Sequence, residues 1–554
     1  MNTSNWKPET GNRKPYQCDV LVIGGGGAGA IAAFEASRHE ALKIVVACKG
    51  PISQSGLTPT GNGGTIFSSP DEIFKTMITA GEFLNDQSVA WFMASELHNA
   101  VEQLIEVGVT VWPLNPHAVS IHGVETLALL RKELIKRPNV ELLEDVLITK
   151  LIRMGEKVSG AIALDLSTGT FFVIEASAII IATGGTAGEL YPRSSNNPFG
   201  VPTDASGTGH AMAYLAGAEL VDMELMQFVP VPANPQCLNL RFFPEFWKGP
   251  FLNRHGDIVV SDPDVYLGAS YSPLFVRKLF DEIQKGNGPI YVDRRGVTSP
   301  DLTLPIKSMK LRRKFIKSLG IDPRENRVEI ALGSHFCMGG IRINEKTETT
   351  TPGLYAAGEV MGGVHGALRL AGHSFAQMIV FGFQAGKEAA NFAKEHRQAR
   401  GPASVDVAGE EERLLPFLQT REDAISASAL RERLQQVMND YLFVVRDKGG
   451  IEKAIDEIRA IKEAVSRVSV PPFKRFNLEW TRAIEFSLMI DCAEIIAESA
   501  LFRKESRGCH YRADFPQWNT EQPPQHTRAR LQDGRLTLDR VPVVIDRMKP
   551  AAAG

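Results

Sequence analysis

The sequence predicts an α/β protein built around a Rossmann-like dinucleotide-binding domain. Three segments carry this prediction: "VLVIGGGGAGA" (20–30), "ASAIIIATGGT" (176–186) and "TPGLYAAGEV" (351–360). Each is an apolar run that ends on small residues, which is typical of a buried strand followed by a tight turn. The chain has 554 residues, which is enough for a large core and two to four domains.

The first segment contains the spacing G-x-G-x-x-G at Gly24, Gly26 and Gly29. In this motif the first glycine allows the tight turn, the second lets the backbone approach a pyrophosphate, and the third lets helix and strand pack closely. The amino end of the following helix then faces the phosphate charge. Cys48 ends the second strand, where an acidic residue usually holds the ribose. We therefore expect a bound dinucleotide, with one departure from the usual ribose contact.

The second and third segments indicate which dinucleotide is bound. One ends on Thr183 and Gly184, and the other ends on Gly358 and Glu359. Together with the first glycine motif they form the three-part signature of FAD-binding Rossmann-like folds. No second G-x-G-x-x-G follows a strand, so the sequence shows no separate NAD(P) domain. Electrons must then be exchanged with a partner protein, a quinone or oxygen.

Composition and periodicity divide the chain. Residues 226–332 are rich in proline and aromatic side chains and break the α/β rhythm, which predicts an inserted domain. Apolar residues at helical spacing over 430–445 predict a helix that ends at Gly449 and Gly450. The predicted order is a flexible leader (1–16), the FAD-binding domain in two parts (17–225 and 333–400), an α+β capping domain (226–332), a linker with a helical domain (401–510) and a C-terminal region (511–554).

The composition excludes several function classes. Sixty-one basic and 64 acidic residues give a net charge of −3, which does not favour binding to nucleic acid or to a membrane surface. The six cysteines contain no C-x-x-C pair, so we expect no metal site, iron–sulfur cluster or disulfide framework. No apolar run approaches the length of a membrane span, and no signal peptide is evident. We therefore expect a cytoplasmic location.

The segment "VHGALRLAGHSFA" (364–376) places Arg369 among glycine, alanine and leucine. A guanidinium buried there would be costly without a partner. The sequence leaves two alternatives: an internal carboxylate, or an anionic ligand that the guanidinium fork binds through two hydrogen bonds.

At this point the chain resembles a known family, the flavoprotein subunits of succinate dehydrogenase and fumarate reductase, a group that includes L-aspartate oxidase and the adenylylsulfate reductase flavoprotein. The resemblance covers about residues 17 to 545. It is carried by "FLNRHGD" (251–257), "SHFCMGGIRI" (334–343), "GLYAAGEVMGGVHGALRLAGHSFA" (353–376) and "RKESRGCHYRADFP" (503–516). It implies a Rossmann-like FAD-binding domain, a mobile α+β capping domain, a C-terminal helical domain and a small C-terminal region.

The resemblance also implies site residues and a partner. The positions of His335 and Arg369 hold a substrate carboxylate against the flavin, and relatives commonly dock an iron–sulfur subunit. His365 and His373 are expected to be structural or to lie beside the flavin. We expect the following residues to contact FAD: Gly24, Gly26, Ala28, Gly29, Cys48, Lys49, Thr58, Gly63, Gly64, Val146, Thr183, Gly184, Glu359, Ser374 and Phe375.

Several family positions are not retained. Leu57 stands where covalent members attach FAD to a histidine, which predicts non-covalent FAD. Val229 replaces a substrate histidine, and Gly207-Thr208-Gly209 replaces a flavin-contacting G-D-G.

The proton-transferring arginine of the capping domain also has no clear match. Ser270, Tyr271 and Ser272 occupy its place, and Arg277 is the nearest arginine. Tyr271 is then the candidate proton donor, because a phenol can serve as a general acid. The cap is expected to carry a cluster of apolar residues, namely Phe228, Val229, Phe242, Phe243, Phe246 and Trp247. These changes favour an anionic substrate that is larger or less charged than fumarate or succinate.

The sequence thus predicts an FAD-dependent oxidoreductase that acts on a C–C or C=C bond and exchanges electrons through a partner protein. Arg369, His335 and Tyr271 are its candidate catalytic residues. Two alternatives stay open: an enzyme like adenylylsulfate reductase, whose flavin takes up sulfite, and a non-catalytic FAD electron-transfer protein.

Overall fold

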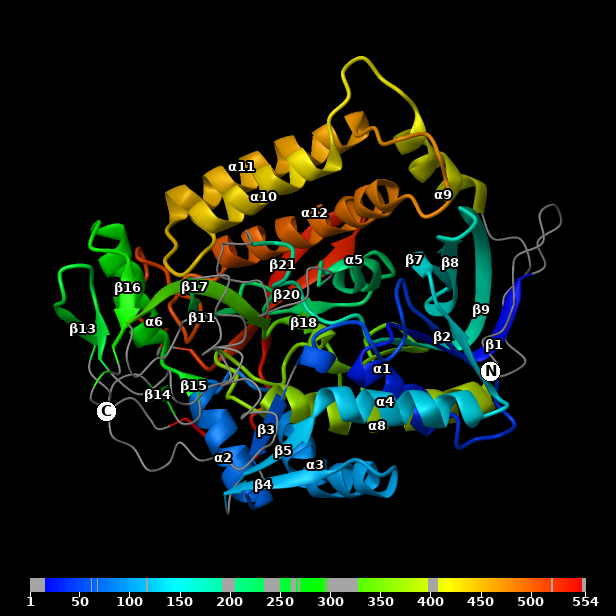
Figure 1. Cartoon of the computed structure of the whole chain (residues 1–554), viewed down its shortest axis with the longest axis horizontal. Coiled ribbons are helices and arrows are strands. Elements are labelled where there is room, and N and C mark those ends of the chain that lie inside the picture. The colour runs from blue at the N-terminus through cyan, green and yellow to red at the C-terminus, as the bar shows by residue number, and fades with distance from the viewer. Residues whose placement is uncertain are drawn as a thin grey trace.

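The computed structural model describes residues 15–60, 62–66, 68–115, 118–191, 205–233, 250–260, 266–267, 270–293, 295, 327–396, 407–519 and 522–550. Within these ranges the chain is an α/β protein with a central mixed sheet, a second sheet at one end and a helical layer along one side (Figure 1). The predicted fold class, a Rossmann-like domain with an inserted α+β domain and a C-terminal helical domain, is confirmed. The predicted leader lies almost entirely outside the described residues.

The central sheet has the strand order β6-β2-β1-β9-β8-β7, with β19 paired to β9. The strands are β1 (Tyr16–Ile23), β2 (Ile44–Ala47), β6 (Val140–Leu143), β7 (Val146–Met154), β8 (Lys157–Asp165), β9 (Thr170–Ile181) and β19 (Leu354–Ala356). β6, β2, β1, β9 and β19 are parallel, whereas β8 and β7 are antiparallel. β1 and β9 are buried along nearly their whole length, and strands covered on both faces read as continuous apolar runs.

Helices α1, α4, α5 and α8 pack against this sheet, while α3 packs on α8 and α2 packs on α3. Their bounds are α1 (Gly27–Ala36), α2 (Pro70–Ala80), α3 (Gln87–Glu106), α4 (Gly123–Lys136), α5 (Thr208–Leu215) and α8 (His373–Glu395). α1 and α8 lie very close together, because a Cβ on Gly382 of α8 would meet Ile31 of α1 at 3.0 Å. A small sheet of β3 (Asn62–Ile66), β5 (Ala118–His122) and β4 (Val111–Asn115) lies beside them (Figure 1).

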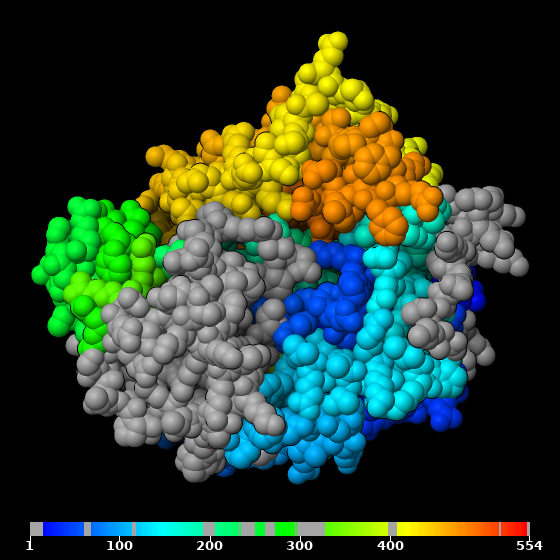
Figure 2. All heavy atoms as spheres, viewed as in Figure 1, coloured from blue at the N-terminus to red at the C-terminus, as the bar shows by residue number. Residues whose placement is uncertain are grey.

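The inserted domain has its own five-stranded sheet, in the order β11-β17-β16-β12-β13. Its elements are β11 (Met226–Pro232), β12 (Phe251–Leu252), β13 (Ile258–Val260), β14 (Tyr266–Leu267), β15 (Ser270–Tyr271), α6 (Pro273–Gln284), β16 (Ile290–Val292) and β17 (Val328–Cys337). Figure 2 shows the green part of this domain as one end of the molecule. The predicted aromatic positions 242, 243, 246 and 247 lie outside the described residues. β11 and β17 pair antiparallel and connect this domain to the FAD-binding domain.

The helical layer consists of α9 (Val407–Leu414), α10 (Ala427–Tyr441), α11 (Lys448–Ala464) and α12 (Leu478–Phe502) (Figure 1). The prediction that a helix ends at Gly449 and Gly450 is wrong. α10 already ends at Tyr441, and both glycines lie in the first turn of α11. The side chain of Asp447 caps α11 by accepting from the Gly450 amide at 2.9 Å, so the cap rather than the glycines defines the boundary.

The C-terminal hairpin joins the sheet β18-β10-β20-β21. Its strands are β18 (Gly340–Ile341), β10 (Leu220–Val221), β20 (Gln525–Gln532) and β21 (Arg535–Pro542). β20 and β21 pair antiparallel and form this hairpin.

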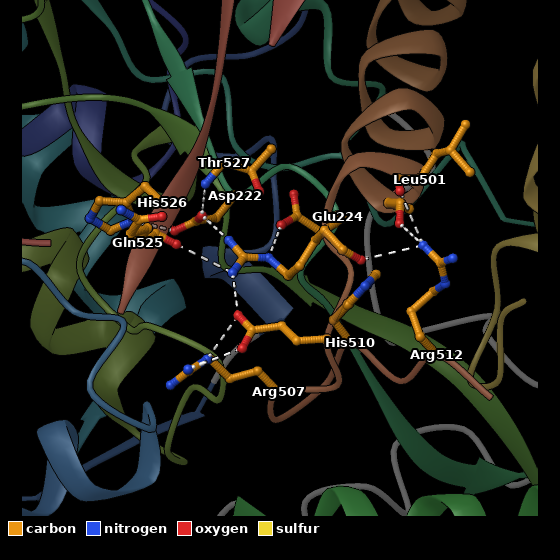
Figure 3. Close-up of polar contacts among 12 residues, drawn as sticks. Asp222, Glu224, Leu501, Arg507, His510, Arg512, Gln525, His526 and Thr527 are labelled. Atoms are coloured by element: carbon orange, nitrogen blue, oxygen red, sulfur yellow. Dashed lines mark hydrogen bonds and ion pairs between the residues drawn. The ribbon is translucent and has the colours of Figure 1, made fainter. Parts of the chain in front are cut away.

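A buried ionic network fixes the segment that follows α12 (Figure 3). The guanidinium of Arg503 donates to Asp222 at 2.8 Å, to Glu505 at 2.9 Å and to Glu224. Glu505 in turn accepts from Arg507. Since breaking a buried network by removing one partner leaves an uncompensated charge, these contacts hold the segment in one position. That segment lies directly against the loop that carries the candidate substrate-binding arginine.

Candidate active site

The turn between β1 and α1 forms an open backbone cradle. Gly24 has φ +108°, and a Cβ there would collide with the carbonyl oxygen of Ala182. A Cβ on Gly29 would collide with the carbonyl of Gly24. At Gly26, by contrast, the nearest atom to a Cβ is the Ser55 carbonyl oxygen at 3.9 Å, and Gly26, the N-cap residue, has no side chain of its own to cap the helix. The space in front of the amino end of α1 suits a phosphate, and a Cβ on Gly26 would project into it.

Several further residues predicted to contact FAD are placed by the structure, and their contacts with FAD stay predictions. The hydroxyl of Thr58 accepts from the Gly27 amide at 3.3 Å, at the amino end of α1. Ala28 lies close to the turn after β19, because a Cβ on Gly358 would be 2.9 Å from the Ala28 Cβ. Gly63 and Gly64 lie on β3 and pair with β5.

Cys48 follows the carboxyl end of β2, at the position where an acidic residue usually holds the ribose. Cys48 is buried, and its carbonyl accepts from the Val146 amide at 3.0 Å, which joins the ends of β2 and β7. The ammonium group of Lys49 forms an ion pair with Glu485 of α12. This contact uses part of the donor capacity of Lys49, and its role towards FAD stays a prediction.

The ends of β9 and β19 add polar groups on the same side. The Thr183 hydroxyl is buried without a hydrogen-bond partner in the described structure, and Gly184 has φ +77° with open space at its Cβ position. Glu359 accepts from the Cys337 amide at 3.1 Å. A buried hydroxyl without a partner beside an open glycine turn fits a polar cofactor, since buried polar groups are normally hydrogen-bonded.

The amino end of α8 is the fourth border of the site. Gly372 is its N-cap in the left-handed conformation, and no side chain caps the helix. Both ring nitrogens of His373 are buried without a partner in the described structure, and burial lowers its pKa to about 3. The ring is therefore neutral. The amides of His373 and Phe375 donate to the carbonyls of Leu370 and Gly372, so the contacts of Ser374 and Phe375 with FAD stay predictions.

Arg369 and His335, which lie 34 residues apart in the chain, are brought together. Arg369 is buried, and its NH2 group donates to Nε2 of His335 at 2.6 Å. Its Nε donates to Gln227 at 3.1 Å and its NH1 donates to the Leu370 carbonyl at 3.0 Å. The guanidinium also lies over the Phe336 ring, 5.0 Å from its centroid. Among the described residues, none of these hydrogen-bond partners carries a negative charge.

The electrostatics of Arg369 distinguish between the two alternatives left by the sequence. Burial lowers its pKa to about 10, against the opposing charge of Glu359, so the group is cationic at neutral pH. No carboxylate of the described residues lies within ion-pair distance of it. The internal ion pair is thus not found in the described structure, and a buried cation with neutral partners suits an anionic ligand.

Gln227 is a site residue that sequence reasoning missed. Its amide oxygen accepts from Arg369 Nε, and its Nε2 donates to the Arg369 carbonyl at 3.0 Å, so it fixes both the side chain and the backbone. The sequence offered one indication of this role, because Gln227 lies at the start of β11, two residues before Val229.

The ring of His365 forms a hydrogen bond with Gln377 at 2.9 Å, and burial lowers the pKa of His365 to about 3.

For the other positions singled out in the sequence, Tyr271, Val229 and Leu57, the structure gives mainly the backbone position. Tyr271 lies in β15, paired with β14, and its side chain lies outside the described structure. Val229 is buried in β11 opposite Gly333 of β17. Leu57, at the covalent attachment position, precedes Thr58 and has no nucleophilic atom, so non-covalent FAD stays a prediction.

A glycine-rich backbone cradle that suits a phosphate, a buried cation and an inserted domain are the features of an FAD-dependent flavoprotein. Comparison with known proteins agrees. Residues 19–375 match the FAD binding domain family, and residues 431–553 match the fumarate reductase flavoprotein C-terminal family. The chain belongs to the succinate dehydrogenase and fumarate reductase flavoprotein family, as a divergent member, and it is an FAD-dependent oxidoreductase of the fumarate reductase flavoprotein type.

Three similar proteins illustrate this relationship. One component of the CoM/CoB fumarate reductase of Methanothermobacter marburgensis is 32% identical over 91% of this chain and 96% of its own length. The FrdA chain of Escherichia coli quinol fumarate reductase has a TM-score of 0.84 at 24% identity, covering 97% of this chain and 98% of its own. Adenylylsulfate reductase from Archaeoglobus fulgidus has a TM-score of 0.80 at 21% identity, covering 98% of this chain and 99% of its own. The fold alone therefore does not select the substrate.

Proposed function

We propose that this protein catalyses oxidation or reduction of a C–C or C=C bond in an anionic substrate other than fumarate or succinate. The observation that carries the proposal is Arg369, a buried guanidinium whose hydrogen-bond partners among the described residues are all neutral. A carboxylate fits such a fork through two parallel hydrogen bonds.

His335 and Gln227 position this cation. A guanidinium only donates hydrogen bonds, so Nε2 of His335 must be the acceptor, and a neutral ring then carries its proton on Nδ1. Gln227 holds the Nε edge of the guanidinium. When bound, FAD supplies the two-electron chemistry. Fixing the anion fixes the position of the reacting carbon, and small errors in that position are costly.

The departures from the family motif support a different substrate. Val229 cannot donate a hydrogen bond to a carboxylate where relatives carry a histidine. A motif arginine that would transfer the proton is replaced by Ser270, Tyr271 and Ser272. Tyr271 stays our candidate for the proton donor, because a phenol can donate a proton where no arginine is present.

We also propose that electrons pass through a partner protein, most simply an iron–sulfur protein. The chain has a single dinucleotide motif, and the Methanothermobacter relative is itself named as one component of a larger enzyme. No helix of the described residues is long and apolar enough to cross a bilayer.

A second candidate is chemistry like that of adenylylsulfate reductase. It is favoured by the absent motif arginine, because addition of sulfite to a flavin needs no proton shuttle at carbon. Anaerobic titration of the purified protein, followed by flavin absorbance, distinguishes the candidates. Perturbation by unsaturated carboxylic acids supports the proposed function, bleaching by sulfite with AMP supports the second candidate, and no response to either indicates a non-catalytic protein.

A further inference from the structure

The guanidinium of Arg369 lies over an aromatic ring. Its central carbon is 5.0 Å from the centroid of the Phe336 ring, which is within the range of a cation–π contact. Both side chains are buried. The hydrogen bonds of Arg369 start from its nitrogen atoms, whereas the Phe336 ring fills the space on one side of the whole guanidinium. The ring therefore limits how far the guanidinium can tilt.

Phe336 is itself held from two directions. Its ring meets the His365 ring edge to face, with centroids 5.4 Å apart and planes at 77°. Nε2 of His365 is in turn hydrogen-bonded to the amide oxygen of Gln377 at 2.9 Å. On the backbone side, the amide of the next residue, Cys337, donates to the Glu359 carboxylate at 3.1 Å. Both the ring and the main chain of Phe336 are thus fixed.

The two supports lead to the same turn after β19. Nε2 of Gln377 donates to the Gly358 carbonyl at 3.0 Å, and Glu359 is the next residue along the chain. Gly358 has φ +80° and belongs, with Glu359, to the third segment of the FAD signature. The contacts therefore close a ring that begins and ends at this turn, and it passes through Gln377, His365, Phe336 and Cys337.

We propose that Phe336 is a positioning residue, which holds the fork of Arg369 at the angle that a substrate carboxylate needs. The inference rests on the proposed function and deepens it, because Phe336 acts on the anion only through Arg369. Two parallel hydrogen bonds from a planar fork depend on its orientation, whereas the attraction of a point charge does not. A guanidinium that tilts keeps its charge but loses part of this paired contact.

The alternative is that Phe336 only fills the core. Its side chain packs with Leu84, Leu225 and Met338, so its removal will lower the melting temperature in either case. Stability alone therefore does not test the proposal. A positioning role predicts, in addition, that the effect of Phe336 on anion binding depends on the fork of Arg369.

The test is a double-mutant cycle on ligand affinity. Flavin absorbance gives the dissociation constants of crotonate, cinnamate and itaconate for the FAD-loaded wild type, Phe336→Leu, Arg369→Lys and the double variant. Phe336→Leu should weaken the acid that binds best by roughly 2- to 12-fold, comparable with the loss of one hydrogen bond. In the Arg369→Lys background, which has no fork to orient, the same change should alter affinity by less than about twofold.

Matched variants separate the flat ring from its volume. Phe336→Tyr keeps a flat ring and should retain most of the wild-type affinity. Phe336→Met fills similar space without a flat face, so it should behave like Phe336→Leu and replaces it in the cycle if that variant does not fold. Phe171→Leu removes a buried ring that packs on Trp480 with centroids 5.9 Å apart, and it should lower the melting temperature while sparing affinity.

The possible failures can be told apart. If Phe336→Leu and Phe336→Met bind the acids as tightly as the wild type, or if the losses from Phe336→Leu and Arg369→Lys simply add, the inference is overturned while the proposed function stands. Equal losses in Phe336→Tyr and Phe336→Leu also overturn it. A wild-type flavin that responds to none of the three acids contradicts the proposed function, and the inference falls with it.

Discussion

His335 accepts a hydrogen bond from Arg369 across 2.6 Å, which joins strand β17 to the loop before α8. We expect His335→Ala to weaken binding of an anionic ligand by about 2- to 12-fold, the value of one ordinary hydrogen bond. His335→Gln should restore much of the loss, because its amide oxygen can accept from the guanidinium. Flavin titration measures both variants, and equal losses in the two would contradict a positioning role.

Because its amide is neutral, Gln227 should leave the positive charge of Arg369 available to an anionic ligand. In Gln227→Glu a carboxylate would lie where the amide oxygen now meets Arg369 at 3.1 Å, and the two charges would neutralise each other. Anion affinity should then fall by roughly 10- to 100-fold. Gln227→Met removes the hydrogen bonds without adding a charge and should cost less. If the Met and Glu variants bind anions equally well, neutral surroundings are not what makes Arg369 an anion site.

Gly26 should be needed for FAD and not for folding. Its Cβ position is free of protein atoms within 3.9 Å, so Gly26→Ala leaves the turn intact but places a methyl group in the phosphate space. Gly50→Ala, in the next loop, is the matched control, because a Cβ there meets only the Ser55 hydroxyl at 3.5 Å. Thermal melting should show both variants folded, and absorbance at flavin wavelengths should show FAD lost only from the first. Full FAD content in Gly26→Ala would refute the cradle.

His526 in the C-terminal hairpin should make the free energy of unfolding of the protein depend on pH. His526 lies between Asp222 and Asp86, where burial alone would lower its pKa, but the two carboxylates raise it to about 10. A pKa raised on folding stabilises the native state below the unfolded value of about 6.5, and this contribution is lost as pH rises towards 10. Urea unfolding at pH 7 and pH 9.5 should show the loss. His526→Gln should flatten this dependence, and an unchanged slope would mean that other groups cause it.

Local features follow from the sequence more readily than contacts between distant segments. The turn at Gly24 and Gly26 depends on neighbouring residues, so its spacing alone predicts it. Gln227 lies 142 residues from Arg369, and no periodicity links them. The resemblance predicts that His335 and Arg369 share a site, but not that they contact each other directly.

Two further features depend on packing or capping that the sequence pattern leaves open. A glycine pair such as 449 and 450 is compatible with a helix end, but it fits a helix start equally well once Asp447 caps it. The ion pair of Lys49 with Glu485 bridges 436 residues and depends on how α12 packs, so the sequence does not predict it. The contact of Lys49 with FAD stays a prediction.

The Arg369→Lys variant tests directly whether Arg369 anchors the substrate anion beside FAD. This variant keeps the charge but loses the fork that now reaches Gln227, Leu370 and His335. The measurement is the dissociation constant of a carboxylate, from its effect on flavin absorbance, in wild-type and Arg369→Lys proteins with equal FAD content and melting temperature. Affinity for the carboxylate should weaken by roughly tenfold or more in the variant. A stable, fully FAD-loaded variant with wild-type affinity would contradict the anchoring role.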